Sequence, residues 1–232
     1  MSGKHVPSIL VTVMRAMHHV RAWYQPGQRG LLGLGFIMGL LLLGGHTPVV
    51  AQNALLGKTQ SAIGTLVVIR PDRIEDRLQG QGVLQLYEGD VLRTEAASQA
   101  VITLQEGIEV ALNENTTLKL LYRWEKANGI TQLLRLKQGE IWVKTGPGPK
   151  QLEVETPVAT AAVREIEFTM KVQDDGQTTL TVIQGTVEFG TAFGTCPIRT
   201  STVSYGVRGK RCTKPEPVDV QPARAWLQGL GK

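Results

Sequence analysis

Residues 136–142 read Leu-Lys-Gln-Gly-Glu-Ile-Trp, in which a polar residue and a glycine separate two apolar, alternating runs. The same arrangement recurs at residues 86–92 (LYEGDVL) and 182–188 (VIQGTVE), with a weaker copy at residues 104–110 (LQEGIEV). Glycine supplies the positive φ that a tight turn or a bulge needs, and the flanking period of two is that of half-buried strands. The repetition predicts one sheet-rich body of short, similar strands rather than a catalytic scaffold decorated with loops.

Strand-like runs fill the chain between residues 64 and 190, and turn signals separate them. This pattern predicts an all-β fold of short, antiparallel-rich strands, arranged as a sandwich, a roll or a solenoid-like stack. Between two such runs, the dipeptide Asp175-Gly176 predicts a hairpin turn of type I′.

The first 51 residues differ in composition from the rest of the chain. They contain no Asp or Glu, and residues 30–45 form an uncharged apolar run that closes on Val49-Val50-Ala51, with small residues at the positions a signal peptidase reads. A basic start, an apolar core and small residues at the cleavage position are typical of a secretory signal peptide. The run is shorter than the roughly 20 residues that span a bilayer. We expect cleavage after Ala51, with an uncleaved anchor as the alternative, and a body that is periplasmic, displayed on the cell surface or released.

The exported body is expected to have four parts: a short linker (52–62), a β domain (63–195), a disulfide-closed loop (196–212) and a proline-rich tail (213–232). Cys196 and Cys212 are the only cysteines, and an even pair in an exported protein indicates a disulfide, with two free buried thiols as the alternative. A closed loop of about 15 residues stabilises a fold by roughly 3 kcal/mol. In the tail, residues 222–230 are expected to form one or two helical turns that dock through Trp226 and Leu230.

Charge and histidine content exclude several functional classes. The chain has 25 Lys and Arg against 20 Asp and Glu, but four of the basic residues lie in residues 1–51. The body is therefore nearly neutral, and a nucleic-acid-binding role loses its support. All four histidines lie there too, which removes Ser-His-Asp and Cys-His catalysis and the commonest zinc ligand from the body. In residues 70–77 acidic side chains alternate with arginine, so we expect ion pairing there rather than calcium binding. We expect no catalytic residue, no cofactor and no metal site.

An ordered set of phrases in the body is similar to the FecR domain, over about residues 60–195. The set comprises Gly64–Val67, Glu88–Thr94, the Gly107 turn, Asn115–Leu118, Leu136–Val143, Thr156–Arg164 and Gln184–Val187. The resemblance implies a largely β module outside the cytoplasmic membrane. The name-giving members transmit an iron-transporter signal through the envelope to a cytoplasmic sigma factor, and many others are exported proteins of unassigned role.

Two departures limit what this resemblance implies. The family follows its Val-Arg pair with Gly-Thr, whereas Glu165 and Ile166 follow here, so a side chain stands where the family has none. Signal-transmitting members also carry a cytoplasmic sigma-binding domain before their membrane span. Only about 30 residues precede the apolar run in this chain, too few for an independent core. We therefore expect the external module without the anti-sigma activity.

Two groups of residues are candidates for contact with a partner. Tyr122, Arg123 and Trp124 combine aromatic rings with a cation, which suits stacking and cation–π contact, while a strand with an aromatic edge is the structural alternative. Arg164 and Glu165 lie where the family motif meets a charged cluster, and a buried or edge ion pair is the alternative for them.

Together these observations predict an exported, non-catalytic, FecR-like binding or structural module of the bacterial cell envelope that recognises a protein or a glycan. Membrane contact is expected only through the N-terminal segment, if that segment is uncleaved. The first alternative is a component of trans-envelope signal transduction that regulates a sigma factor through a partner. The second is a carboxylate-based enzyme acting on wall polysaccharide, which needs two acidic side chains that converge in a cleft.

Overall fold

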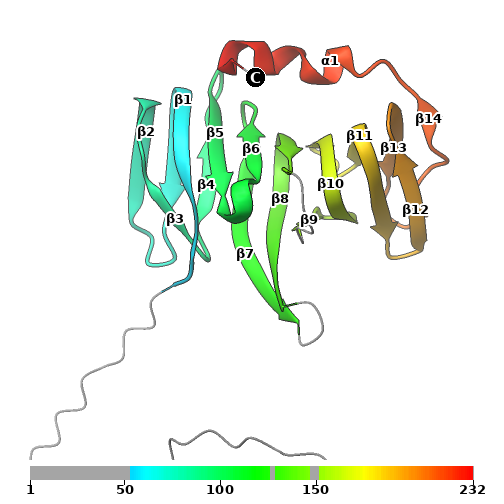
Figure 1. Cartoon of the computed structure of the whole chain (residues 1–232), viewed down its shortest axis with the longest axis horizontal. Coiled ribbons are helices and arrows are strands. Elements are labelled where there is room, and N and C mark those ends of the chain that lie inside the picture. Colours follow the sequence, from blue (N-terminus) through cyan, green and yellow to red (C-terminus); the bar gives the residue numbers. More distant parts are fainter. Residues whose placement is uncertain (1–52, 126–128, 147–151, 232) are drawn as a thin grey trace, which may run out of the picture. The chain divides into compact units, whose positions relative to one another are not determined.

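The computed structural model describes residues 53–125, 129–146 and 152–231, so the expected signal segment lies outside the described residues. Strands dominate the described part and confirm the predicted all-β fold (Figure 1). The strands are β1 (Leu55–Ile69), β2 (Glu75–Gln81), β3 (Gln85–Tyr87), β4 (Val91–Thr94), β5 (Gln99–Leu104), β6 (Glu109–Leu112), β7 (Thr117–Glu125), β8 (Gly129–Lys144), β9 (Leu152–Glu155), β10 (Ala159–Val172), β11 (Thr178–Thr191), β12 (Gly194–Arg199), β13 (Thr202–Gly206) and β14 (Glu216–Pro217). A single turn of 3-10 helix, η1 (Gln105–Gly107), connects β5 to β6.

Six of these strands close into an antiparallel barrel. β1 pairs with β4 and β5, β4 pairs with β7, and β5 pairs with β6. β8 completes the ring, because residues 129–138 pair with β7 and residues 141–144 pair with β6. The predicted sandwich or roll is thus realised as a barrel, which leaves none of its six strands without neighbours on both sides.

A second group of strands extends outward from the same β8. The second half of β8 also pairs with β10, which pairs with β11, and β11 carries β12 and β13 at its two ends. β9 lies parallel to the first half of β8 and antiparallel to β10. We call β9 to β13 the outer sheet; Figure 1 shows it to the right of the barrel. A single 16-residue strand therefore belongs to both layers.

The recurring glycine acts in two ways. Gly89 lies in the turn between β3 and β4, whereas Gly139 and Gly185 lie inside the long strands β8 and β11. All three have a positive φ, of 89°, 88° and 95° respectively. At Gly139 the backbone runs so close to Thr116 that an added Cβ would lie 2.5 Å from the Thr116 Cα atom. The expected positive φ is confirmed, but at two of the three positions the strand continues through a kink instead of reversing.

One continuous hydrophobic core joins the barrel to the outer sheet. It contains Leu66 and Leu118 from barrel strands and Phe168 and Phe189 from β10 and β11, all of them fully buried. Because both layers share this core as well as β8, the described residues from Leu55 onward form one packed body.

Three segments differ from their expected form. Residues 55–62, expected in a linker, are the first half of β1 and pair with β3 and β5. Residues 196–212, expected as a loop, contain most of β12 and all of β13, which both pair with β11. In the hairpin between β10 and β11 the N–H of Gly176 bonds to the carbonyl of Gln173 at 2.9 Å, and among the turn residues only Gly176 has a positive φ. The turn is therefore a type I turn that ends on a left-handed glycine, and the expected type I′ turn is wrong.

The C-terminal segment crosses the ends of the strands (Figure 1). β14 pairs with β13, and the helical turns α1 (Gln221–Arg224) and η2 (Ala225–Leu230) follow. Leu227 is fully buried against Val101, Ala111 and Trp142, while Trp226 packs beside it, half-buried. The expected helical turns are present, and their main anchor is Leu227.

Candidate functional site

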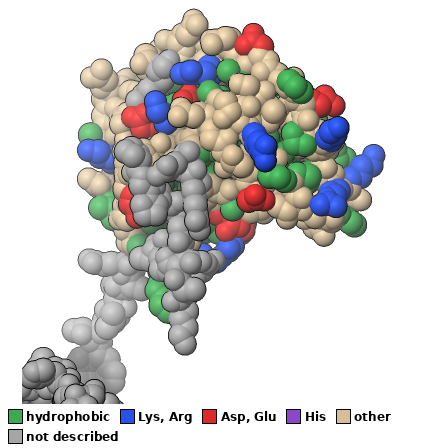
Figure 2. Space-filling model, turned by 45° about the vertical axis from the view of Figure 1, so that its right-hand side comes forward, with side chains coloured by type: hydrophobic (Ala, Val, Ile, Leu, Met, Phe, Trp, Pro, Cys, Tyr) green, Lys and Arg blue, Asp and Glu red, His purple; other side chains and the backbone are tan. Residues whose placement is uncertain are grey.

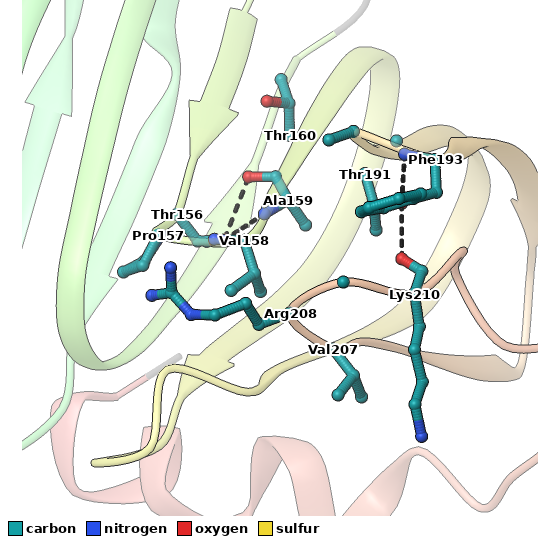
Figure 3. Close-up of a pocket in the computed structure, with 13 residues that line it drawn as sticks. Thr156, Pro157, Val158, Ala159, Thr160, Thr191, Phe193, Val207, Arg208 and Lys210 are labelled. Carbon is teal, nitrogen blue, oxygen red and sulfur yellow. Dashed lines mark hydrogen bonds between the residues drawn. The ribbon is translucent and has the colours of Figure 1, made fainter.

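A cleft opens at one end of the outer sheet, where three connecting segments meet (Figure 3). The β9–β10 turn contributes Thr156–Thr160, the β11–β12 turn contributes Gly190–Phe193, and the chain after β13 contributes Val207–Lys210. The cleft has a volume of about 540 Å³. We call it the basic cleft, for the charges described below.

The first wall of the basic cleft is a turn that the side chain of Thr156 holds in place. Its hydroxyl oxygen accepts hydrogen bonds from the N–H groups of Ala159 (3.0 Å) and Val158 (3.4 Å), and it also accepts one from the Thr178 hydroxyl (2.9 Å). Pro157 follows Thr156 and presets the backbone for a tight turn. The wall is therefore rigid before any ligand arrives.

The second wall presents an exposed aromatic ring. The Thr191 hydroxyl donates to the carbonyl of Lys210 at 2.9 Å and accepts from the N–H of Phe193 at 3.2 Å, which ties two loops together (Figure 3). The Phe193 side chain is left 60% exposed. Next to it, Cys196 and Cys212 form the predicted disulfide, with their Cα atoms 6.2 Å apart.

The charge of the basic cleft is uncompensated. Arg208 and Lys210 line it and are exposed, no Asp or Glu lines it, and neither side chain forms an ion pair with any residue that the structure describes. In Figure 3 Arg208 lies beneath the Thr156–Val158 turn, whereas Lys210 extends outward from the rim. Residues 189–215 contain five basic and no acidic residues. Figure 2 shows Lys and Arg side chains beside hydrophobic ones, with Asp and Glu side chains among them, toward the right of the face that it presents.

A second charged group lies on the barrel. Asp90 is fully buried, and its Oδ2 atom accepts hydrogen bonds from Arg70 Nη1 at 2.6 Å and from the Tyr87 N–H at 2.8 Å. Arg70 also pairs with Asp76 at 2.9 Å and lies over the ring of Tyr87, 5.5 Å from its centre. Burial raises the pKa of Asp90 more than the Arg70 charge and the Tyr87 N–H lower it. The ion pairing expected within residues 70–77 is present here, and Asp90 extends it.

Acidic side chains also share a cleft. A space of about 640 Å³ is lined by Glu114, Glu140, Asp174 and Asp175, among other residues, and Glu140 accepts a hydrogen bond from the Asn113 amide at 3.2 Å. Within residues 53–125, 129–146 and 152–231, no three acidic, histidine or cysteine side chains are grouped as a metal ion requires. No helix in these ranges is long and apolar enough to cross a membrane.

Five of the six barrel strands, the glycine kinks at Gly139 and Gly185 and the Thr156 turn lie within the match to one known family. Residues 90–188 match the family described as FecR protein. Residues 90–188 form a FecR domain. FecR domains are generally non-catalytic, and the domain contains the first wall of the basic cleft together with Asp90. No curated protein sequence matches the chain.

The fold also occurs in solved structures. Two crystal structures, each of a "putative anti-sigma factor" from Parabacteroides distasonis ATCC 8503, at 1.65 and 2.50 Å resolution, match with a TM-score of 0.50 and 21% sequence identity. The matches cover 60% of this chain and 65% and 64% of those chains. The chain thus spans less than two thirds of the length of these relatives. At this identity the likeness concerns the fold alone.

The second wall of the basic cleft lies beyond the FecR domain. Phe193, Arg208, Lys210 and the disulfide follow residue 188, where the family match ends. The cleft is therefore built partly by the FecR domain and partly by the chain that follows it.

In the predicted group of Tyr122, Arg123 and Trp124, two aromatic residues lie on β7 and the charge of Arg123 is neutralised. Arg123 bonds to Glu153 at 2.8 Å and to Glu155 at 3.2 Å, while Tyr122 packs half-buried against the core. Trp124, 66% exposed, remains accessible at the end of β7. The three residues lie together on β7, none of them lines the basic cleft, and their contact with a partner stays a prediction.

Arg164 and Glu165 lie in β10, where the register against β11 shifts between Arg164 and Glu167. The side chains of Arg164 and Glu165 lie outside what the structure describes, so their expected role stays a prediction. Two residues further on, the buried Glu167 accepts a hydrogen bond from Trp142 Nε1 at 3.0 Å and lies 3.4 Å from Arg224 Nε of the C-terminal segment. Through Glu167, the charged cluster predicted here helps to hold the C-terminal segment in place.

Sequence reasoning missed the basic cleft because its parts lie in three separate segments. Phe193 is a lone aromatic residue, and the expected loop around Arg208 gave no reason to single out one basic residue. The signal that was present is the absence of acidic residues from 189 to 215, which a local charge count would have found.

Proposed function

We propose that this protein is an exported component of trans-envelope signal transduction that takes part in sigma-factor regulation by binding a protein partner. The observation that carries the proposal is the FecR domain at residues 90–188. The shared fold with a protein named as a putative anti-sigma factor agrees with it.

Two features support this compartment. The expected N-terminal signal segment would direct the body out of the cytoplasm. The disulfide between Cys196 and Cys212 suits an oxidising compartment, because cytosolic thiols are kept reduced. On this proposal the FecR domain meets its partner on the outer side of the cytoplasmic membrane, in the periplasm or at the cell surface.

The mode of action is recognition without chemistry. A body without histidine lacks the usual general base, and a rigid barrel with an accessible cleft suits a binding module. A binding module influences a distant sigma factor only if its partner responds differently to the bound and free states. The protein therefore acts through its partner, which carries the signal to the cytoplasm.

The test is gene deletion in the source bacterium, followed by transcript sequencing. We expect the transcripts of one sigma-factor regulon to change several-fold, and the full-length chain to restore them. A matched variant without residues 1–51 stays in the cytoplasm and should not restore them. Mass spectrometry of the purified product locates its N-terminus, which we expect at Gln52. Unchanged sigma-dependent transcripts, or restoration by the cytoplasmic variant, would refute the proposal, and capture of polysaccharide alone would favour the glycan-binding module instead.

A further inference from the structure

We propose that the basic cleft binds an acidic segment of the partner protein, with a carboxylate on Arg208 and an apolar side chain on Phe193. This inference rests on the proposed function, because it names the chemistry of the same partner. It concerns residues 156–160, 190–193 and 207–210, which surround the cleft.

The charge of the ligand follows from the unpaired cations. Several arginines elsewhere on the body are neutralised, as Arg123 is by Glu153 and as Arg135 is by Glu155 at 2.7 Å. Arg208 and Lys210 have no such partner among the described residues. A guanidinium binds a carboxylate through two parallel, charge-assisted hydrogen bonds, about twice as strong as those to a neutral acceptor. A ligand that carries carboxylates therefore complements the cleft.

The apolar part of the ligand follows from Phe193. The Phe193 ring is 60% exposed and shares the cleft lining with Val207, Pro157 and Val158, so apolar surface is left in contact with water. A ligand side chain that covers this ring removes that surface from water, and aromatic residues contribute strongly to interfaces for this reason. A segment with both carboxylates and an aliphatic or aromatic side chain satisfies both halves of the cleft.

These requirements favour a peptide over a glycan. An acidic polysaccharide supplies carboxylates but no large apolar group for Phe193, whereas adjacent acidic and apolar residues are ordinary in a protein. Exposed ion pairs contribute little individually, so the apolar contact is needed for useful affinity. The prior rigidity of both walls helps, because little conformational freedom is lost on binding. The Thr156 turn, the Thr191 bridge and the disulfide supply that rigidity.

The first step of the test uses a random heptapeptide display library against the disulfide-intact exported body. Enrichment should favour peptides with at least two acidic residues and one aromatic or aliphatic residue. The double variant Arg208→Glu/Lys210→Glu should lose these peptides. The matched control Arg199→Glu/Lys214→Glu has the same net charge change at exposed positions outside the cleft, and it should retain them.

The second step measures the affinity of the most enriched peptide by fluorescence anisotropy. We expect a loss of roughly tenfold or more with the cleft double variant and with a peptide whose acids are replaced by amides, but less than roughly threefold with the control variant. Phe193→Ala should weaken binding in addition, and raising the salt concentration should weaken it further. Enrichment of neutral peptides, no enrichment at all, or equal losses in the cleft and control variants would overturn the inference. So would tight binding of an alginate oligosaccharide where no peptide binds.

The outcomes separate this inference from the proposed function. Peptide binding at the cleft without any effect of gene deletion on sigma-dependent transcripts would refute the proposed function and support the inference. If deletion changes those transcripts and the cleft double variant restores them fully, the proposed function stands and the inference fails.

Discussion

Replacing Gly139 by alanine tests the claim that the recurring glycine is required where β8 passes from one set of neighbours to the next. Gly139 has a φ of 88°, and a left-handed conformation costs an alanine about 1–2 kcal/mol. The added Cβ would also lie 2.5 Å from the Cα atom of Thr116. Thr116 is fully buried, and its hydroxyl accepts the N–H of Glu140 at 3.0 Å, so it has little room to move.

The crowding adds the cost of an overpacked site, about 1–3 kcal/mol. The free energy of unfolding of Gly139→Ala should therefore fall by about 2–5 kcal/mol, a large part of the 5–15 kcal/mol typical of a folded domain. Gly80→Ala is a matched control, because Gly80 has a φ of 75° but no atom within 4 Å of the added Cβ. It should lose only the backbone part, about 1–2 kcal/mol.

Equilibrium unfolding in urea, with the disulfide intact, measures both variants. The difference between them isolates the contact with Thr116, and we expect it to be about 1–3 kcal/mol. Equal losses in the two variants, or a loss at Gly139 of less than about 1 kcal/mol, would show that β8 tolerates a side chain at its kink and that the glycine is incidental.

Three further changes have expected outcomes. Burial raises the pKa of Asp90, so the stability of the wild type relative to Asp90→Asn should be greatest below about pH 3.9 and should fall as the pH rises through the raised pKa. Urea unfolding of both proteins across this pH range measures the slope, and an opposite slope would show that ion pairing dominates. Replacing Cys196 and Cys212 by serine should lower the free energy of unfolding by about 3 kcal/mol, and a loss below about 1 kcal/mol would contradict the loop-closure account. Leu227→Ala should detach the C-terminal segment, because removing a buried leucine side chain costs about 2–5 kcal/mol. Trypsin should then cleave α1 roughly thirtyfold faster or more while the barrel stays folded. The exposed Gln228→Ala should leave the rate unchanged, and equal rates in the two variants would refute the anchoring role of Leu227.

Features encoded by neighbouring residues were predictable. The positive φ at Gly89, Gly139 and Gly185 follows from a glycine between alternating runs, because few other residues adopt that conformation. The pairing of Cys196 with Cys212 follows from their number and the expected compartment. In both cases the residues that impose the constraint can be compared directly in the sequence.

Features that depend on distant pairing were not predictable. No alternation marks β2, because it is a largely exposed edge strand in which Leu78 is the one buried residue. Residues 55–62 were assigned to a linker because their buried positions, Leu56, Thr59 and Ala62, fall on every third residue and not in alternation, and one of them is polar. The closure of the barrel depends on β8 pairing with both β6 and β7, which no local pattern specifies.

One wall of the basic cleft could be predicted from the sequence, and the other could not. The Thr156 turn belongs to the FecR resemblance and could be located in advance, since a threonine before a proline specifies its own local hydrogen bonds. The opposite wall, with Phe193 and Arg208, is brought to it only by the order of strands in the outer sheet. A sequence shows which residues are present there but not that they face the same cleft.

The strand β8 has a mechanical consequence. Its hydrogen bonds hold the barrel on one side and the outer sheet on the other, and the two layers also share one core, so there is no seam along which they could separate. A force applied along the strands of the outer sheet loads the hydrogen bonds of β8 in shear, several at once, rather than opening them one at a time. Such a force reaches the barrel through β8 and the shared core.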